Sequence, residues 1–186
     1  MIHDILFALW FFLPAALANM IPIPIAKVPF LKKYNAPMDF GKTYRGKRIF
    51  GSHKTWRGFI AGIITATLVL WLQQWLGSQY AWAANFTNQV DYASLPTLIL
   101  GPLFAIGALG GDAVESFFKR QRGTPPGHGW FPWDQLDYII GASILTAPLV
   151  ALTFWQYVWL IILWFGIHLL ATYIGWLIGF GWWGGA

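Results

Sequence analysis

The sequence predicts an all-α, polytopic membrane protein with about five transmembrane helices and two cytoplasmic polar loops. Composition is the first observation behind this prediction: of the 186 residues, 57% are hydrophobic and only 10% are charged, whereas about a quarter of an ordinary soluble domain is charged. The second observation is the length of the apolar stretches, and the third is the crowding of charged residues into two short segments. A lipid bilayer is the solvent that suits such a chain.

Five apolar segments are long enough to cross a bilayer as helices. A helix needs about 20 mostly apolar residues, and at least about 17, to cross roughly 30 Å of hydrocarbon. The segments predicted to do so are Ile5 to Ala26, Phe59 to Leu76, Leu95 to Gly111, Ile139 to Trp155 and Tyr157 to Phe180. In the third of them, Gly107 and Gly111 have the spacing that lets two membrane helices pack closely. We expect residues 1–186 to form a single integral membrane domain.

The placement of basic residues predicts the orientation in the membrane. Nine of the 12 Lys and Arg residues lie between Lys27 and Arg57, and the other three lie between Asp112 and Asp137. Short cytoplasmic loops retain an excess of Lys and Arg, so both loops are expected in the cytoplasm. The connection Gly77 to Ser94 has no basic residue and is expected outside, together with the N-terminus. The expected location is therefore the cell membrane, and the absence of Cys fits loops in a reducing compartment.

The second polar loop begins with charged residues at helical spacing. If the third apolar helix continues beyond Gly111, a rotation of about 100° per residue places Asp112, Glu115, Ser116 and Lys119 on one face. This face would extend directly from the membrane-spanning part of the helix. Acidic and basic groups would then lie side by side at the membrane surface.

A second pair of carboxylates, Asp134 and Asp137, lies at the start of the fourth apolar segment. The helix dipole favours each of them there by about 0.3 to 1 kcal/mol, and capping explains one of them. Capping does not explain why acids from two helices gather beside Lys and Arg. Carboxylate oxygens suit Mg²⁺, which fills its remaining positions with water and substrate phosphate. A metal-dependent phosphate site is therefore predicted, and the alternative is a solvated rim of charges.

Glycines and basic residues alternate in the first polar loop, in the stretches Gly41 to Arg48 and Gly51 to Gly58. Glycine lets backbone approach a phosphate closely, while Lys and Arg supply charge and forked hydrogen bonds. The pattern is typical of a site for a polyanionic ligand. A topology signal that binds anionic headgroups, at about 1 kcal/mol per basic residue, is the competing interpretation.

At these two loops the chain resembles the CDP-archaeol synthase family, which is related to the bacterial phosphatidate cytidylyltransferases. The matching stretches are Gly46 to Gly51, Lys54 to Gly58, Gly111 to Arg120 and Asp134 to Asp137. The resemblance runs nearly end to end. Gln135 stands where the phosphatidate enzymes have Arg, which agrees with the archaeal-type branch, and His128-Gly129-Trp130 replaces their His-Gly-Gly.

The resemblance implies an enzyme that transfers CMP from CTP to a membrane lipid phosphate, releasing pyrophosphate and leaving a CDP-lipid. The acceptor would be 2,3-bis-O-geranylgeranylglycerol 1-phosphate or a phosphatidate-like lipid, and Mg²⁺ the cofactor. The acceptor phosphate would attack the α-phosphorus of CTP in line, without a covalent enzyme intermediate. CTP, the lipid phosphate and the bilayer are the expected partners, with no nucleic acid and with the oligomeric state left open.

The resemblance also implies roles for individual residues. Asp134 and Asp137 would be metal ligands, with Asp112 as a third, and Lys119 would complete the catalytic set. The substrate-binding residues would be Lys47, Arg48, Lys54, Thr55, Arg57, Ser116, Arg120 and His128. For His128, a structural role in its loop is an equal interpretation.

Three other functions compete with this one. A transporter or channel usually has ionisable groups near the bilayer midplane, and here only His168 lies deep in an apolar segment, where a lone His is more often packed than a proton relay. A CDP-alcohol phosphotransferase has a longer acidic pattern that this sequence lacks. A lipid-binding scaffold without turnover would not need the acidic pairs.

Overall fold

The computed structural model describes residues 2–87, 89–125 and 128–177, and nearly all of its regular structure is helical. The helices are α1 (Ile2–Met20), α2 (Pro22–Lys27), α3 (Trp56–Gln79), α4 (Ala81–Thr87), α5 (Thr97–Gln121), α6 (Trp133–Thr146) and α7 (Phe154–Leu177), with short 3-10 turns at Pro29–Leu31 and Tyr92–Ser94. Strands β1 (Thr43–Tyr44) and β2 (Lys47–Arg48) form an antiparallel hairpin. The predicted all-α class is confirmed.

Four stretches of helix are long and apolar enough to cross a membrane: Ile2–Lys27, Trp56–Gln79, Thr97–Gln121 and Phe154–Leu177. They correspond to the first, second, third and fifth predicted segments. The end of the fifth segment, residues 178–180, lies outside the described residues. Helix α6, in place of the fourth segment, has 14 residues. A polytopic membrane protein is therefore confirmed, and a count of five crossings stays a prediction.

The boundary between the last two helices differs from the predicted one. Instead of a helix from Ile139 to Trp155, α6 ends at Thr146 and α7 begins at Phe154. The start of α7 is set by a capping box: the Gln156 amide N–H donates to Thr153 Oγ1 (3.3 Å), and the Thr153 amide N–H donates to Gln156 Oε1 (2.7 Å). Such a reciprocal pair satisfies two donors that a helix start otherwise leaves unpaired.

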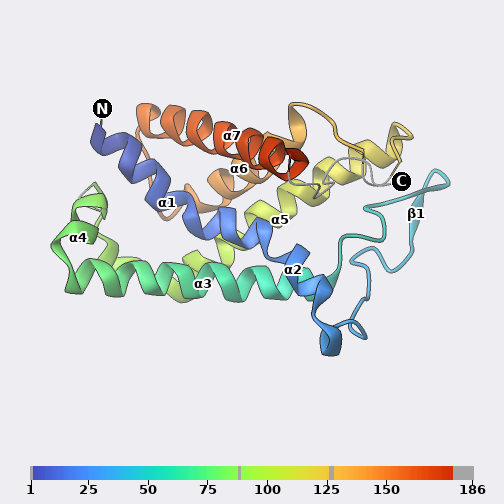
Figure 1. Ribbon diagram of the computed structural model, residues 1–186, viewed down its shortest axis with the longest axis horizontal. Helices are drawn as coiled ribbons and strands as arrows, with labels where there is room; N and C mark the ends of the chain where they lie inside the picture. The colour runs from blue at the N-terminus through green and yellow to red at the C-terminus, as the bar shows by residue number, and fades with distance from the viewer. Residues whose placement is uncertain (1, 88, 126–127, 178–186) are drawn as a thin grey trace.

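Helix α1 lies at the centre of the bundle, between α3 and α7 (Figure 1). Its buried side chains Phe11 and Phe12 pack against Phe104 of α5, Phe12 also packs against Trp164 of α7, and Phe7 stacks on Phe11. Pro14 lies inside α1 without ending it. The other large contact surface joins α5 to α6, and α3 packs along α5.

Helices α5 and α6 approach each other at glycines. A Cβ atom on Gly107 would lie 2.5 Å from the Gly141 carbonyl oxygen, and one on Gly111 would lie 2.1 Å from the Asp137 carbonyl oxygen. A Cβ on Gly141 would lie 2.1 Å from the Gly107 oxygen. No side chain fits at these points, so the close packing predicted for Gly107 and Gly111 is confirmed.

Both charged loops lie at the same end of the bundle, where the hairpin extends beyond α5 (Figure 1). Lys47 Nζ donates to the carbonyl of Gln121, at the end of α5, over 2.7 Å. At the opposite end, Gln89 donates to Asp4 over 3.2 Å, so the 77–94 connection lies beside the start of α1. This arrangement agrees with the predicted grouping of the loops on two sides.

Candidate metal and phosphate site

The carboxylates of Asp112, Glu115 and Asp137 form a cluster where α5 and α6 meet. Each offers one oxygen, and these oxygens all lie within 4.8 Å of one another. Asp112 and Glu115 share a face because α5 continues for ten residues beyond Gly111, to Gln121. Asp137 reaches the same point because its backbone is in contact with Gly111. The glycine packing thus positions the cluster.

The cluster suits a divalent cation. Ligand oxygens around Mg²⁺, each at about 2.1 Å, are at most about 4.2 Å apart, so only small side-chain shifts are needed to enclose one. Within the described chain, Glu115 Oε1 is buried and accepts no hydrogen bond. Its ion-pair partner, the Lys119 ammonium 3.4 Å away, also donates a hydrogen bond to Asp134, so a cation would add to the positive charge that balances this buried oxygen. The residues present therefore fit a metal of the predicted kind.

Glu115 was predicted to share the face of Asp112 but was not among the predicted ligands. Its spacing of three residues from Asp112 carries the same signal as the spacing of Asp134 and Asp137. Burial is what marks Glu115 as a member of the site, since only 6% of its surface is exposed. The sequence does not reveal this burial, because it depends on which face of α5 is covered by α6.

Asp134 lies beside the cluster and is engaged by other groups. Lys119 Nζ donates to Asp134 Oδ1 over 2.7 Å, and the Trp130 amide N–H donates to Asp134 Oδ2. The Lys119 ammonium also lies 3.4 Å from Glu115 Oε1, one helical turn away on α5. Lys119 therefore joins the first turn of α6 to the acidic face of α5. Asp134 as a metal ligand stays a prediction.

Lys54 brings the first loop to the acidic cluster by forming an ion pair with Asp112. The backbone of Lys54 is held within the first loop, because the Met38 amide N–H donates a hydrogen bond to the Lys54 carbonyl over 2.7 Å. Burial lowers the pKa of Lys54, but the negative charges of Asp112, Asp137 and Glu115 outweigh this effect and hold the pKa above its usual value. A fixed positive charge therefore lies against the cluster.

Asp39 organises the first loop from inside. Its carboxylate accepts hydrogen bonds from the amide N–H groups of Gly41, Phe50 and Gly51, each 3.0 Å long, and from the guanidinium of Arg48. Burial raises the pKa of Asp39, but these donors outweigh it and hold the pKa well below its usual value. Asp39 is the only acid between Lys27 and Arg57, and that isolation was a sequence signal for this role.

Replacing Asp39 by Asn is expected to lower the stability of the first loop by about 2 kcal/mol at neutral pH, because it removes a charged acceptor shared by four donors. The pKa of Asp39 is lower in the folded protein than in the unfolded chain, so its contribution is present above about pH 4 and is lost as the pH falls through the folded-state pKa. Thermal unfolding curves of both proteins should therefore differ at pH 7 and converge at strongly acidic pH. A constant difference across that range would contradict this role.

Several predicted substrate-binding residues hold the first loop in place. Arg48 pairs with Asp39 and Lys47 with the end of α5. Thr55 caps α3 by accepting the Gly58 amide N–H over 3.3 Å. Arg57 donates to the Leu31 carbonyl over 2.8 Å. Thr55 and Arg57 also line a cavity of about 230 Å³ beside Ser52 and His53.

The remaining predicted binding residues come from the second loop. Ser116 is buried on α5, one residue after Glu115. Arg120 donates to the Pro125 carbonyl over 3.1 Å, which holds the turn after α5. His128 is exposed in that loop. The structure thus brings Lys54, Ser116 and Lys119 to the cluster or its helix face, and His128 has no described side-chain contact with it.

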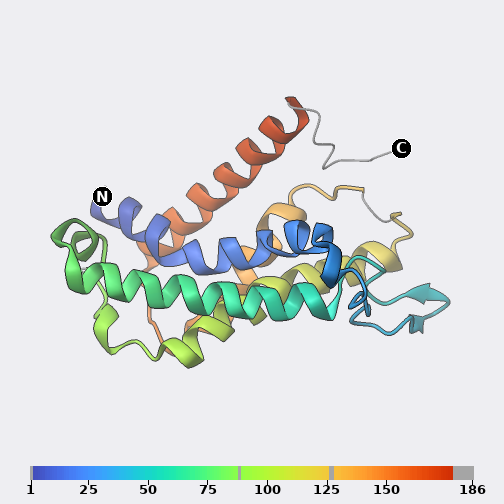
Figure 2. The same ribbon diagram turned by 60° about the horizontal axis from the view of Figure 1, so that its bottom comes forward.

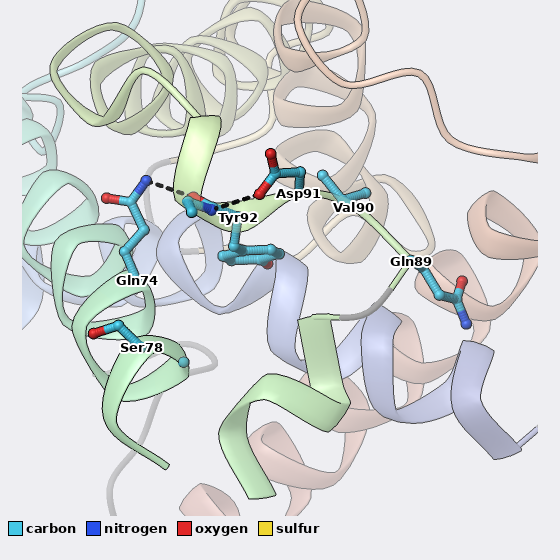
Figure 3. Close-up of a pocket in the computed structure, with 8 residues that line it drawn as sticks. Gln74, Ser78, Gln89, Val90, Asp91 and Tyr92 are labelled. Carbon is cyan, nitrogen blue, oxygen red and sulfur yellow. Dashed lines mark hydrogen bonds between the residues drawn. The ribbon is translucent and has the colours of Figure 1, made fainter. Parts of the chain in front are cut away.

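A larger cavity, of about 440 Å³, lies at the opposite end of the bundle (Figure 3). Its polar groups bind one another: Gln74 donates to the Tyr92 carbonyl over 2.8 Å, and the Ala93 amide N–H donates to Asp91 over 3.2 Å. The bond from Gln74 ties α3 to the segment before α5, and the bond to Asp91 is local to that segment. None of the predicted site residues lines this cavity.

The fold and the site define an integral membrane protein with a carboxylate cluster and paired lysines at one end of its helices. A family model described as CarS-like, CDP-archaeol synthase, matches residues 1–183. This chain belongs to the CDP-archaeol synthase family.

Individual relatives agree with the family assignment. The chain is 37% identical over 147 residues to a CDP-archaeol synthase of Pyrococcus furiosus, covering 78% of this chain and 77% of the relative. It is 33% identical over 180 residues to that of Thermococcus kodakarensis, covering 96% and 95%. A solved structure, described as an intramembrane enzyme for archaeal membrane lipids biosynthesis, matches with a TM-score of 0.60 and 27% identity, covering 84% of this chain and 92% of that one. The predicted resemblance is confirmed.

Proposed function

We propose that this protein transfers CMP from CTP to the phosphate of an archaeal membrane lipid, giving a CDP-lipid and pyrophosphate. An oxygen of the lipid phosphate forms a bond to the α-phosphorus of CTP, while the bond between that phosphorus and the bridging oxygen to the β-phosphate breaks, and the leaving pyrophosphate keeps the electron pair. The observation that carries the proposal is the cluster of Asp112, Glu115 and Asp137 between Lys54 and Lys119, in a member of this family.

We assign the metal-binding role to Asp112, Glu115 and Asp137. Bound there, Mg²⁺ would neutralise charge on the triphosphate and help to orient it. We assign Asp134 to orienting Lys119, because the Lys119 ammonium donates a hydrogen bond to Asp134. Geometry favours Glu115 over Asp134 as the third ligand because only Glu115 belongs to the close group of oxygens.

Positive charge on both sides of the cluster suits the phosphate groups of the two substrates. Lys54 pairs with Asp112 and Lys119 pairs with Glu115, so two lysines from different elements contact different members of the cluster. Arg57 and Thr55 line the adjoining cavity, where a phosphate or ribose group of CTP could bind. These groups bind and orient substrate phosphates, which is the main task in phosphoryl-type transfer. The family assignment leaves a transporter, a channel or a scaffold without support.

The direct test is Mg²⁺-dependent conversion of labelled CTP to a lipid-soluble product by the purified protein. An isoprenoid ether-lipid phosphate and phosphatidate are offered in separate reactions, with the corresponding phosphate-free glycerolipids as controls. We expect product with the ether-lipid phosphate and none with the phosphate-free lipids. Folded protein that makes no CDP-lipid from either phosphate would refute the proposal.

We propose that the charged loops face the cytoplasm, where CTP is available. Because the chain has no Cys, single Cys residues introduced at the exposed positions Ser52 and Ser94 report the two sides. In intact cells a membrane-impermeant maleimide should label S94C and leave S52C unlabelled until the membrane is opened. Labelling of S52C from outside would reverse the assignment.

A further inference from the structure

His168 of α7 lies beside the first turns of α6, close to the candidate metal site. Its ring packs against that of Tyr138, with 5.7 Å between centroids, and Tyr138 directly follows Asp137. Tyr138 donates its hydroxyl to the Trp164 carbonyl over 3.2 Å, and Trp164 Nε1 donates to the Ala8 carbonyl over 3.1 Å. These bonds fix α7 to α6 and α1 one helical turn before His168, so the position of the imidazole is well defined.

The surroundings of His168 differ from those of a merely packed histidine. It is half-buried, and its ring lies against Tyr138, the residue that follows the cluster carboxylate Asp137. It is also the only His, Lys, Arg, Asp or Glu after Asp137. An ionisable side chain in an otherwise apolar membrane helix is costly, which favours a functional role.

The part of α7 beyond His168 faces away from the rest of the described bundle. Leu170, Tyr173 and Trp176 are 57%, 56% and 68% exposed, and Figure 2 shows this end of α7 diverging from the other helices. Such an apolar surface suits hydrocarbon chains. His168 therefore lies between this apolar surface and Tyr138, which directly follows Asp137 of the acidic cluster.

We propose that His168 binds the phosphate of the lipid substrate from the membrane side, while Lys54 of the first loop and Lys119 near the end of α5 contact the acidic cluster. This inference rests on the proposed function, because it names the group that receives the acceptor. An imidazole N–H donates to a phosphate oxygen whether the ring is neutral or charged. The hydrocarbon chains of the lipid would then lie along α7, with the phosphate directed at the site.

Three variants separate binding from packing. H168F keeps an aromatic ring against Tyr138 but has no donor, and H168Q keeps a donor without the ring. H3Q is the matched control, because His3 is exposed on α1 at the opposite end of the molecule. Binding of a dialkylglycerol phosphate, compared with the phosphate-free dialkylglycerol, is measured in nanodiscs for each protein, together with the KM values for lipid phosphate and for CTP.

We expect H168F to weaken lipid-phosphate binding and to raise the lipid KM by about tenfold, the effect of one charge-assisted hydrogen bond. The KM for CTP should change less than about twofold, H168Q should recover most of the loss, and H3Q should match the unaltered protein. Normal lipid binding by H168F, or equal changes in both KM values, would overturn the inference. Absence of product from the unaltered protein would refute the proposed function instead, while the binding measurement would still decide the role of His168.

Discussion

Asp137→Asn is expected to lower turnover by more than about 1,000-fold while leaving the protein folded. The substitution keeps the shape of the side chain and removes its charge, so the packing of α6 on α5 should be unaffected. It leaves two of the three carboxylates in the cluster, and carboxylate oxygens are ligands that hold Mg²⁺. The rate measured against Mg²⁺ concentration should need much more metal, and Mn²⁺ binding followed by electron paramagnetic resonance should weaken in parallel.

Asp134→Asn gives the sharpest comparison, because it distinguishes the two carboxylates of α6. If Asp134 orients Lys119, its loss should reduce kcat while leaving the Mg²⁺ concentration for half-maximal rate nearly unchanged. Asp91→Asn is the control, since Asp91 is exposed at the opposite end and Asn can replace its capping hydrogen bond. If the Mg²⁺ concentration for half-maximal rate rises more in D134N than in D137N, Asp134 is a metal ligand and the assignment of Glu115 is wrong.

Gly111→Ala is expected to abolish most activity without touching a polar group. The added Cβ would lie 2.1 Å from the Asp137 carbonyl oxygen, so α6 must move away from α5. Overpacking of this kind costs about 1 to 3 kcal/mol, and a shift of about 1 Å at a reacting centre costs about 100-fold in rate. Both a lower unfolding temperature and a loss of turnover of at least that size should be measured.

Gly110→Ala is a closely matched control for this substitution. The two glycines are adjacent on α5, but a Cβ on Gly110 meets nothing within 4 Å in the described structure. G110A should therefore keep its activity, with a stability equal to or slightly above that of the unaltered protein, because Ala favours helix more than Gly does. Equal losses in G110A and G111A would show that helix flexibility, and not the contact with α6, explains the effect.

Much of this arrangement could be predicted from local patterns. The apolar segments predicted the four long helical stretches, because a membrane-spanning helix is recognised by its length and apolarity alone. The face that carries Asp112 and Glu115 followed from helical rotation, and the close approach at Gly111 from small-residue spacing. The sequence also contained the signal for the start of α7, because Thr153 and Gln156 have capping-box spacing.

The partners of individual charges could not be predicted in the same way. The pairing of Lys54 with Asp112 joins residues 58 positions apart, and nothing local selects that acid over Asp134 or Asp137. The choice between Glu115 and Asp134 depends on how far α6 is rotated against α5, which is set by glycine contacts along the interface. The role of Asp39 depends on a loop conformation with positive φ at Gly41 and Gly51, which no periodic pattern encodes.

The carboxylates of the acidic cluster lie close together in the sequence, so the ribosome adds them within a short interval. All of them come from one helical hairpin, between Asp112 and Asp137, whose two helices pack at the glycines. Contacts between near neighbours in sequence form early and quickly, so this half of the site can assemble as soon as α6 has been made. Lys54 is already present by then, whereas α7 is still missing. The nascent chain can therefore assemble the candidate metal site before it acquires the helix that carries His168.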